Sequence, residues 1–553
     1  MRTGPLAGTL VRQFMARPGP FRAGSTVRRI GVIVLQRLVV CLVFLSGIAH
    51  ADLPGGERIG TLAAQVQTLA DVREIASELA AMPFVPKPDV PDRLKQLSYE
   101  QFISIGYRHR NAVWDRTDSR FRVETFHQGF VQREDVTLYV REDGRNRLVP
   151  FDRDDFDYGG LRIDPDDIVG AGHAGVKVIG RFPGDDSFSE VITFLGGCYF
   201  RARSADTIYG TSARGVAVNQ ALPVDEEFPF FRAFWITRPA GGADHMSALA
   251  LVDSPSLVGA YRFTIRPGES VTEVDIESSL HFRADVQKIG VAPLTSMWIW
   301  GDGIRRPSLD ARPHVHDSDL LVVETDDGSV TARPLARIAY PSVSSIDAGS
   351  LVGFALTQRN RDFDQYNDTG ANYHHRPTVA VYPNDTWRGG RVELFEIPGA
   401  HEGIDNIGAW WIPPDLPKAG DVLDLSYVVT FGSEDYAPVT RPPRSRLTDF
   451  DVRRYADADG DLIMLTGVYT GETPGGAMDA DLVTIRGELV DKTFETTDDG
   501  FTMSLTLRPT EDAPMQIEAT PRVGDDRVGE RLVYLCPRRH PAFVFPAVYT
   551  QTE

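Results

Sequence analysis

Between residues 58 and 82, apolar side chains recur at spacings of three and four residues. They are Leu62, Val66, Leu69, Val72, Ile75 and Leu79. This spacing places them on one face of an α-helix, so we predict one amphipathic helix here. We expect it to be the only long helix, because the rest of the chain follows a different pattern.

Further along the chain, apolar and polar residues alternate, which is typical of strands with one buried face. The clearest alternating apolar sets are Tyr261, Phe263 and Ile265, and then Val274, Ile276, Leu280 and Phe282. Fifty glycines and 37 prolines divide the remaining sequence into short runs between turns. This pattern predicts an all-β protein made of sandwiches or barrels, and no fixed-period repeat indicates a propeller or a solenoid.

The length of 553 residues suggests about two large β-domains. We predict an N-terminal domain over residues 52–431 and a linker over 432–446, where the sequence GSEDYAPVTRPPRSR is polar and rich in proline. Residues 447–553 alternate again, with Phe501, Met503, Leu505 and Leu507 on one face. They are numerous enough for one small β-sandwich.

Residues 1–51 have the composition of an export signal. They contain seven arginines and no acidic residue, then the apolar run LVVCLVFLSGIA, with Ala49 and Ala51 as small residues before a cut. A membrane anchor is the alternative, but the uninterrupted apolar run is shorter than the ~20 residues that a spanning helix needs. We therefore expect a periplasmic protein with no membrane insertion after signal removal, and the export route stays open.

Signal removal makes the chain more acidic. The loss of seven basic residues lowers the formal net charge from −19 to −26, which disfavours nucleic acid and anionic lipid as partners and suits a neutral polymer such as a sugar chain. Cys198 and Cys536 remain, and both lie in apolar, strand-like sequence. We predict two buried free thiols.

Two aspartates are candidates for acid and base chemistry. Asp405 lies in GIDNIGAWW between two isoleucines, and Asp317 lies in HVHDSDLL. Burial among apolar residues would keep a carboxyl group protonated for proton donation. A hydrogen-bonded turn is the alternative at each position, and with 77 acidic residues composition alone does not decide.

Other residues are candidates for gripping sugar hydroxyls or for forming ordinary structure. Arg361, Asp362 and Tyr366 lie in QRNRDFDQY, where a salt-bridge network is the alternative. Tyr209 and Arg214 lie in TIYGTSARG, where a tight turn with a core tyrosine is the alternative. We predict no metal and no cofactor, because the histidine pairs lack a third ligand and no nucleotide-binding motif is present.

The tryptophans could stack against sugar rings, although core packing is their commoner fate. We expect Trp298 and Trp300 to share one strand face, and Trp410 and Trp411 to point to opposite faces, with at least one of the latter meeting a cleft. Trp300 and Trp410 are the candidates for substrate contact.

Several motifs together resemble one family. FHQG, GGCYFRARSADTIYGTSARG, LVDSPSLVGAYRF, VAPLTSMWIWG, HDSD, QRNRDFDQY, YHHRPTVAVYP and DNIGAWWIP occur in this order, which is similar to the osmoregulated periplasmic glucan biosynthesis protein G and D family over residues 55–432. The resemblance implies a large mutarotase-like supersandwich with a long cleft and a C-terminal immunoglobulin-like domain. It also implies a periplasmic protein that acts on the β-1,2-glucan backbone.

The resemblance also implies an activity: members of this family are inverting β-1,2-glucanases, with Asp405 at the position of the general acid and Asp317 at that of the general base. The base would act through a chain of waters, and the two carboxyls would lie farther apart than the ~5 Å of a retaining pair. Arg361, Asp362, Tyr366, Tyr209 and Arg214 would position substrate and water. A transglycosylase that makes cyclic or branched glucans and a non-catalytic glucan-binding factor are the alternatives, and a homodimer is possible in this family.

Overall fold

The computed structural model describes residues 53–87, 89–304, 306–399, 401–433 and 444–539. The predicted export signal and most of the predicted linker lie outside these residues. Strands dominate the described residues, which confirms the predicted all-β class. No helix in these ranges combines the length and the apolar character needed to cross a membrane.

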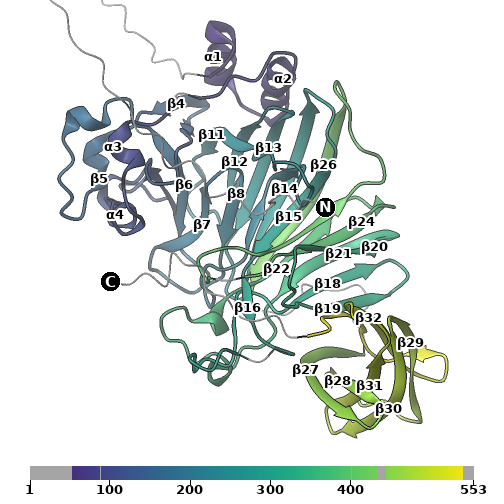
Figure 1. Cartoon of the computed structure of the whole chain (residues 1–553). Coiled ribbons are helices and arrows are strands. Elements are labelled where there is room, and N and C mark those ends of the chain that lie inside the picture. The colour runs from purple at the N-terminus through teal and green to yellow at the C-terminus, as the bar shows by residue number, and fades with distance from the viewer. Residues whose placement is uncertain (1–52, 88, 305, 400, 434–443, 540–553) are drawn as a thin grey trace, which may run out of the picture. The chain divides into compact units, whose positions relative to one another are not determined.

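Two large, mostly antiparallel sheets form most of the described structure (Figure 1). The ten-stranded sheet contains, in spatial order, β2 (Phe121–His127), β6 (His173–Gly180), β7 (Ser189–Leu195), β8 (Tyr199–Ala202), β9 (Ser212–Arg214), β15 (Ile289–Ser296), β25 (Ile407–Ile412), β24 (Arg391–Glu396) and β20 (Ser342–Asp347), with β10 (Val216–Val218) also paired to β15. The sixteen-stranded sheet contains β29 (Met478–Ile485), β32 (Met515–Val523), β34 (Arg531–Cys536), β19 (Val330–Pro334), β18 (Leu320–Thr325), β21 (Ser350–Thr357), β22 (Thr378–Pro383), β26 (Val422–Gly432), β14 (Val271–Phe282), β13 (Leu257–Arg266), β12 (Met246–Asp253), β11 (Phe230–Thr237), β3 (Thr137–Glu142) and β4 (Arg145–Val149), with β23 (Trp387–Arg388) and β33 (Asp526–Arg527) on its flanks.

The main core lies between these two sheets and is rich in aromatic rings. Phe194 of the ten-stranded sheet lies 5.1 Å from Phe263 and 5.6 Å from Phe231 of the sixteen-stranded sheet, measured between ring centroids. Each buried phenylalanine contributes roughly 1.5–3 kcal/mol through the apolar surface removed from water. The predicted alternation in β13 and β14 is confirmed, because Ile265 and Ile276 are fully buried.

The predicted single long helix is wrong, because two helices occupy this stretch. α1 (Gly56–Gln65) ends before Val66, and α2 (Leu69–Ala80) begins after Thr68. The side chain of Asp71 accepts the backbone N–H groups of Gln67 and Thr68 at 2.7 and 2.8 Å, so a capping box starts a second helix where the pattern alone continues the first. Both helices pack on the outer face of β11, β12 and β13 (Figure 1).

The remaining helices and small sheets lie in the connections. They are α3 (Asp92–Lys95), α4 (Tyr99–Ile103), the pair β1 (Gly106–Tyr107) and β5 (Phe156–Asp157), and the pair β16 (Trp298–Trp300) and β17 (Val315–His316).

The C-terminal strands form a second sandwich. Its four-stranded sheet contains β27 (Ser445–Asp457), β28 (Gly460–Gly471), β31 (Gly500–Pro509) and β30 (Gly487–Thr497). Its other layer is β29, β32 and β34, which continues the sixteen-stranded sheet because β34 pairs with β19. One apolar cluster joins Leu505 and Ile517 of this sandwich to Val322 of the large sheet. The predicted domain boundary at residue 447 stays a prediction. Strand pairing between β19 and β34 and one shared apolar cluster connect the two sides of this boundary.

Both predicted free thiols are confirmed. Cys198 and Cys536 are buried and free, and the Cys198 thiol donates to the backbone oxygen of Val216.

Candidate active site

The ten-stranded sheet has one apolar face and one polar face. Phe200 of β8 points into the main core, so its neighbour Arg201 points to the opposite face. Paired positions across β2, β6, β7 and β8 place Glu124, Lys177, Thr193 and Arg201 in one row on that face. This row of polar and charged side chains faces away from the core. Arg201, at one end of the row, faces Asp405.

Asp405 lies in the turn just before β25 and faces Arg201. The Arg201 Nη2 atom lies 3.5 Å from the Asp405 Oδ2 atom. The predicted burial of Asp405 is wrong, because its side chain is 35% exposed and Ile404 beside it is 52% exposed. Only the following isoleucine, Ile407 at the start of β25, turns into the core.

Asp317 lies between β17 and β18 and is the buried member of the pair. Its side chain is 12% exposed, and the Arg376 Nε atom lies 3.4 Å from its Oδ1 atom. Burial raises the pKa of Asp317 to about 6, with Arg376 opposing the shift and the charge of Asp405 adding to it. Asp317 is therefore largely ionised at neutral pH and still basic enough to accept a proton.

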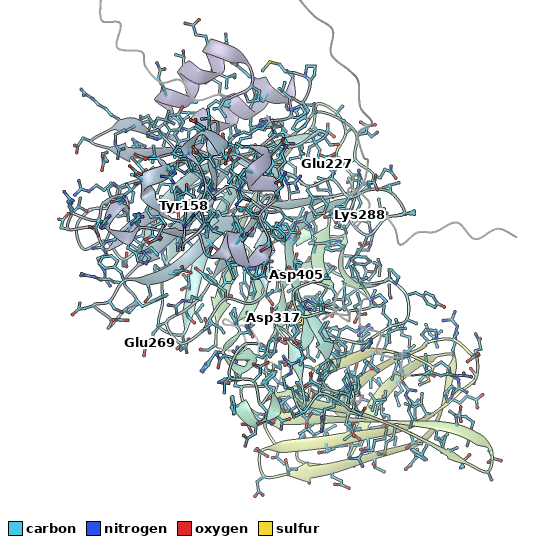
Figure 2. All side chains as sticks on the ribbon, turned by 60° about the vertical axis from the view of Figure 1, so that its left-hand side comes forward. Tyr158, Glu227, Glu269, Lys288, Asp317 and Asp405 are labelled. Carbon is cyan, nitrogen blue, oxygen red and sulfur yellow. The ribbon has the colours of Figure 1, made fainter. Side chains whose placement is uncertain are left out.

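Both acids are anchored to the end of β15, by its last residue and the residue after it. The backbone N–H of Asp317 donates to the oxygen of Met297 at 2.8 Å. The backbone N–H of Asn406, the residue after Asp405, donates to the oxygen of Ser296 at 3.0 Å. The two aspartates therefore come from different loops that meet at one point, and Figure 2 labels both side chains.

A buried hydroxyl network fixes this meeting point. Thr211 Oγ1 donates to Ser296 Oγ at 2.9 Å, and Ser296 Oγ lies 2.7 Å from Ser318 Oγ. All three residues are at most 1% exposed. Because Ser318 follows Asp317 directly, the network holds the loop of Asp317 against β15.

Tyr209 and Arg214 lie on or beside the ten-stranded sheet, and their predicted role in positioning substrate stays a prediction. Arg214 lies on β9 beside Tyr199, with its guanidinium 4.7 Å from the Tyr199 ring, and donates to Glu226 at 2.7 Å. The backbone oxygen of Tyr209 accepts a hydrogen bond from Arg376, the partner of Asp317. Tyr209 also lines a cavity of about 860 Å³ on the polar face of the ten-stranded sheet.

Arg361, Asp362 and Tyr366 make structural hydrogen bonds within the protein. Arg361 donates to the backbone oxygen of Gly432 at 3.3 Å. Asp362 caps a short 3₁₀ helix by accepting the N–H of Asp364 at 3.0 Å. Tyr366 is fully buried, and its hydroxyl donates to a backbone oxygen. The position of Tyr366 leaves no surface for direct contact with a ligand.

The tryptophans lie in the protein interior. The prediction that Trp298 and Trp300 share one strand face is wrong, because a β-bulge lies between them. Their rings pack in two different apolar clusters. Trp411 stacks on Trp387 in the main core, while the Trp410 Nε1–H donates to Glu393 at 3.1 Å. Trp410 and Trp411 are 4% and 5% exposed, so the prediction that one of them meets a cleft is wrong in this structure.

The sequence-based prediction missed the two arginines that face the acids. Arg201 lies in the motif GGCYFR and Arg376 lies in YHHRP. These family motifs could have marked both arginines as candidate site residues. The pairing of Arg201 with Asp405 and of Arg376 with Asp317 appears only in the folded chain. In the described ranges, no group of three or more His, Cys, Asp or Glu side chains is arranged to hold a metal ion.

The fold and the site define an all-β sandwich protein with two loop carboxylates at the end of β15, each facing an arginine. Residues 68–536 match the profile of the family described as "Periplasmic glucan biosynthesis protein, MdoG". The chain therefore belongs to this family.

Named relatives agree with this assignment. "Glucans biosynthesis protein G" of Serratia proteamaculans (strain 568) is 34% identical, covering 85% of this chain and 93% of the relative. The protein of the same name from Rhodopseudomonas palustris (strain ATCC BAA-98 / CGA009) is 38% identical, covering 66% of this chain and 73% of the relative. Among solved structures, a galactose mutarotase related enzyme from Lactobacillus acidophilus aligns with 44% of this chain and 98% of its own, at 8% identity and a TM-score of 0.19.

Proposed function

We propose that the protein is a periplasmic glycoside hydrolase that cleaves the β-1,2-glucan backbone by inversion. The observation that carries the proposal is the meeting of Asp317 and Asp405 at one segment, each beside an arginine, at the end of a polar sheet face. The family name supports glucan as the substrate class. A neutral glucan also suits the strongly negative charge of the chain.

Asp317 is the general base in this proposal. Its buried carboxylate has a pKa of about 6, which is close to the pH at which a base is most effective. Its Oδ1 atom is buried and faces Arg376, and it accepts no hydrogen bond from the described residues. Arg376 holds the carboxylate in place and favours its ionised form.

Asp405 is the general acid. Its side chain is 35% exposed, so a bound sugar chain has access to it. Arg201 faces the carboxylate at 3.5 Å and holds it in position.

Product analysis tests the proposal directly. Linear β-1,2-glucan incubated with the protein should give shorter linear oligosaccharides, with the opposite anomeric configuration in the first product detected by NMR. Cyclic products, which lack one water by mass, would show a transglycosylase instead. Binding without any product at high protein concentration would overturn the enzymatic proposal and leave a glucan-binding factor.

A further inference from the structure

Arg312 lies outside the predicted site but joins three segments beside it. Its Nη2 atom donates to Asp310 Oδ2 and to Glu402 Oε1, both at 2.7 Å, and its Nη1 atom donates to Asp368 Oδ2 at 2.7 Å. The Arg312 side chain is only 21% exposed. One guanidinium thus binds carboxylates that precede β17, precede β22 and precede β25.

The indole of Trp300 fixes Arg312 from the interior side. The centre of the guanidinium lies 5.7 Å from the Trp300 ring, and the Trp300 Nε1–H donates to the backbone oxygen of Arg312 at 3.1 Å. Trp300 is 2% exposed. A rigid aromatic support and three carboxylate partners leave Arg312 little freedom to move.

Glu402 connects Arg312 to both aspartates. It lies three residues before Asp405 in the same turn, and its Oε2 atom accepts the hydroxyl hydrogen of Tyr373. The Tyr373 ring lies 5.5 Å from the guanidinium of Arg376, which faces Asp317. The negative charge of Glu402 is also among the influences that raise the pKa of Asp317.

The charged and titratable groups around Asp317 come from several elements. They are Arg376, Arg201 of β8, Asp405 and Glu402 of the turn before β25, and the tyrosines Tyr366 and Tyr373. Of these, Glu402 is the one whose charge Arg312 neutralises directly.

We propose that Arg312 is a positioning residue that holds the turn of Asp405 in place and, by pairing with Glu402, offsets part of the negative charge that Glu402 presents to Asp317. The inference rests on the proposed function for its kinetic consequences, but its electrostatic part concerns the folded protein alone. Arg312 touches no reacting atom in this scheme and acts through Glu402.

The kinetic test uses the full chain and the variants Arg312→Met, Arg312→Lys, Glu402→Gln and Arg312→Met/Glu402→Gln. In Arg312→Met the acidic limb of kcat/KM against pH should move up by about 0.2–0.4 pH unit, because the charge of Glu402 is then less compensated and disfavours the ionised form of Asp317. The added Glu402→Gln change should move the limb back. Arg312→Lys keeps one charge but not the planar fork, so kcat should fall about tenfold with the limb unmoved.

Arg453→Met is the matched control, because Arg453 forms an exposed pair with Asp451 in the C-terminal sandwich. It should change neither the limb nor kcat. An unmoved limb in Arg312→Met, or a double variant no closer to the wild type than the single variant, would overturn the inference.

A stability measurement separates this inference from the proposed function. The difference in unfolding midpoint between Asp317 and Asp317→Asn proteins, followed from pH 4 to 8, reports the ionisation of Asp317 without any catalysis. The pH at which this difference is half complete should be higher when both proteins also carry Arg312→Met. If this shift occurs but no glucan is cleaved, the proposed function fails and the role of Arg312 stands. If glucan is cleaved but no shift occurs, the role of Arg312 fails and the proposed function stands.

Discussion

Asp317 and Asp405 carry the same functional group and each faces an arginine, yet their surroundings differ. Asp317 follows a short buried strand and its side chain is 12% exposed. Asp405 follows a surface turn and its side chain is 35% exposed. The fold alone encloses the first carboxylate, whereas the second is partly open to solvent.

This difference agrees with opposite roles in an inverting reaction. A base must be ionised before the substrate arrives, and a buried carboxylate with a pKa of about 6 meets that need while remaining a better base than an exposed aspartate. An acid must deliver its proton to the leaving oxygen, and the open side of Asp405 gives a bound sugar chain access to the carboxyl group.

The largest expected effect is loss of catalysis on neutralising either acid. Asp317→Asn and Asp405→Asn should each lower kcat on linear β-1,2-glucan by about 10²- to 10⁴-fold, because each removes one proton transfer. Glucan binding, followed by isothermal calorimetry, should stay within a few-fold of the wild type. Asp451→Asn, in the C-terminal sandwich, is the control and should retain full activity. Wild-type turnover in either site variant would remove that residue from the mechanism.

The pH dependence of kcat/KM should reveal the buried acid specifically. The rate should rise with pH through about 6, because Asp317 is protonated and inactive as a base below that value. The residual activity of Asp317→Asn should lack this limb, whereas that of Asp405→Asn should keep it. A limb that persists without Asp317 would assign the titration to another group.

The same contrast should be visible in stability. The pKa of Asp317 is about 6 in the folded protein and 3.8 in the ordinary reference state, so the folded state binds the proton more tightly. The stabilising contribution is complete below pH 3.8 and is lost as pH rises through about 6. Asp317→Asn should therefore raise the free energy of unfolding by about 1–3 kcal/mol at pH 7 and have little effect near pH 4.

Asp405→Asn supplies the comparison, with an expected change within about 0.5 kcal/mol at any pH, because exposed ion pairs contribute little. Chemical denaturation at pH 4, 5.5 and 7 measures both variants. A destabilised Asp317→Asn protein at pH 7 would show that the pair with Arg376 outweighs the desolvation of the carboxylate.

Much of the fold follows from local patterns, because the alternation in β13, β14 and β31 reports directly which side chains face a core. The break between α1 and α2 was missed because an apolar period of three to four residues continues across it. The hydrogen bonds that Asp71 accepts start a second helix at this point. The pattern of apolar residues does not show whether these bonds are more favourable than one continuous helix.

The site was predictable only in part. Motifs indicated Asp317 and Asp405, but Ile404 beside Asp405 turns to solvent, which depends on the backbone of the turn rather than on residue type. Arg201 and Asp405 are about 200 positions apart, and only the order of β8, β9, β15 and β25 in the sheet brings them together. The bulge between Trp298 and Trp300 likewise breaks the strict alternation on which their predicted common face depended.

The smallest expected effect comes from removing the arginines one at a time. Arg376→Met removes the cation that favours the ionised form of Asp317, so the acidic limb of kcat/KM should move up by about 0.5–1 pH unit. Arg201→Met should move it less, because Arg201 faces Asp405 and its influence on Asp317 is weaker than that of Arg376. Equal shifts for the two variants would contradict the separate pairing, since they would mean that both guanidinium groups act on one shared carboxylate pair.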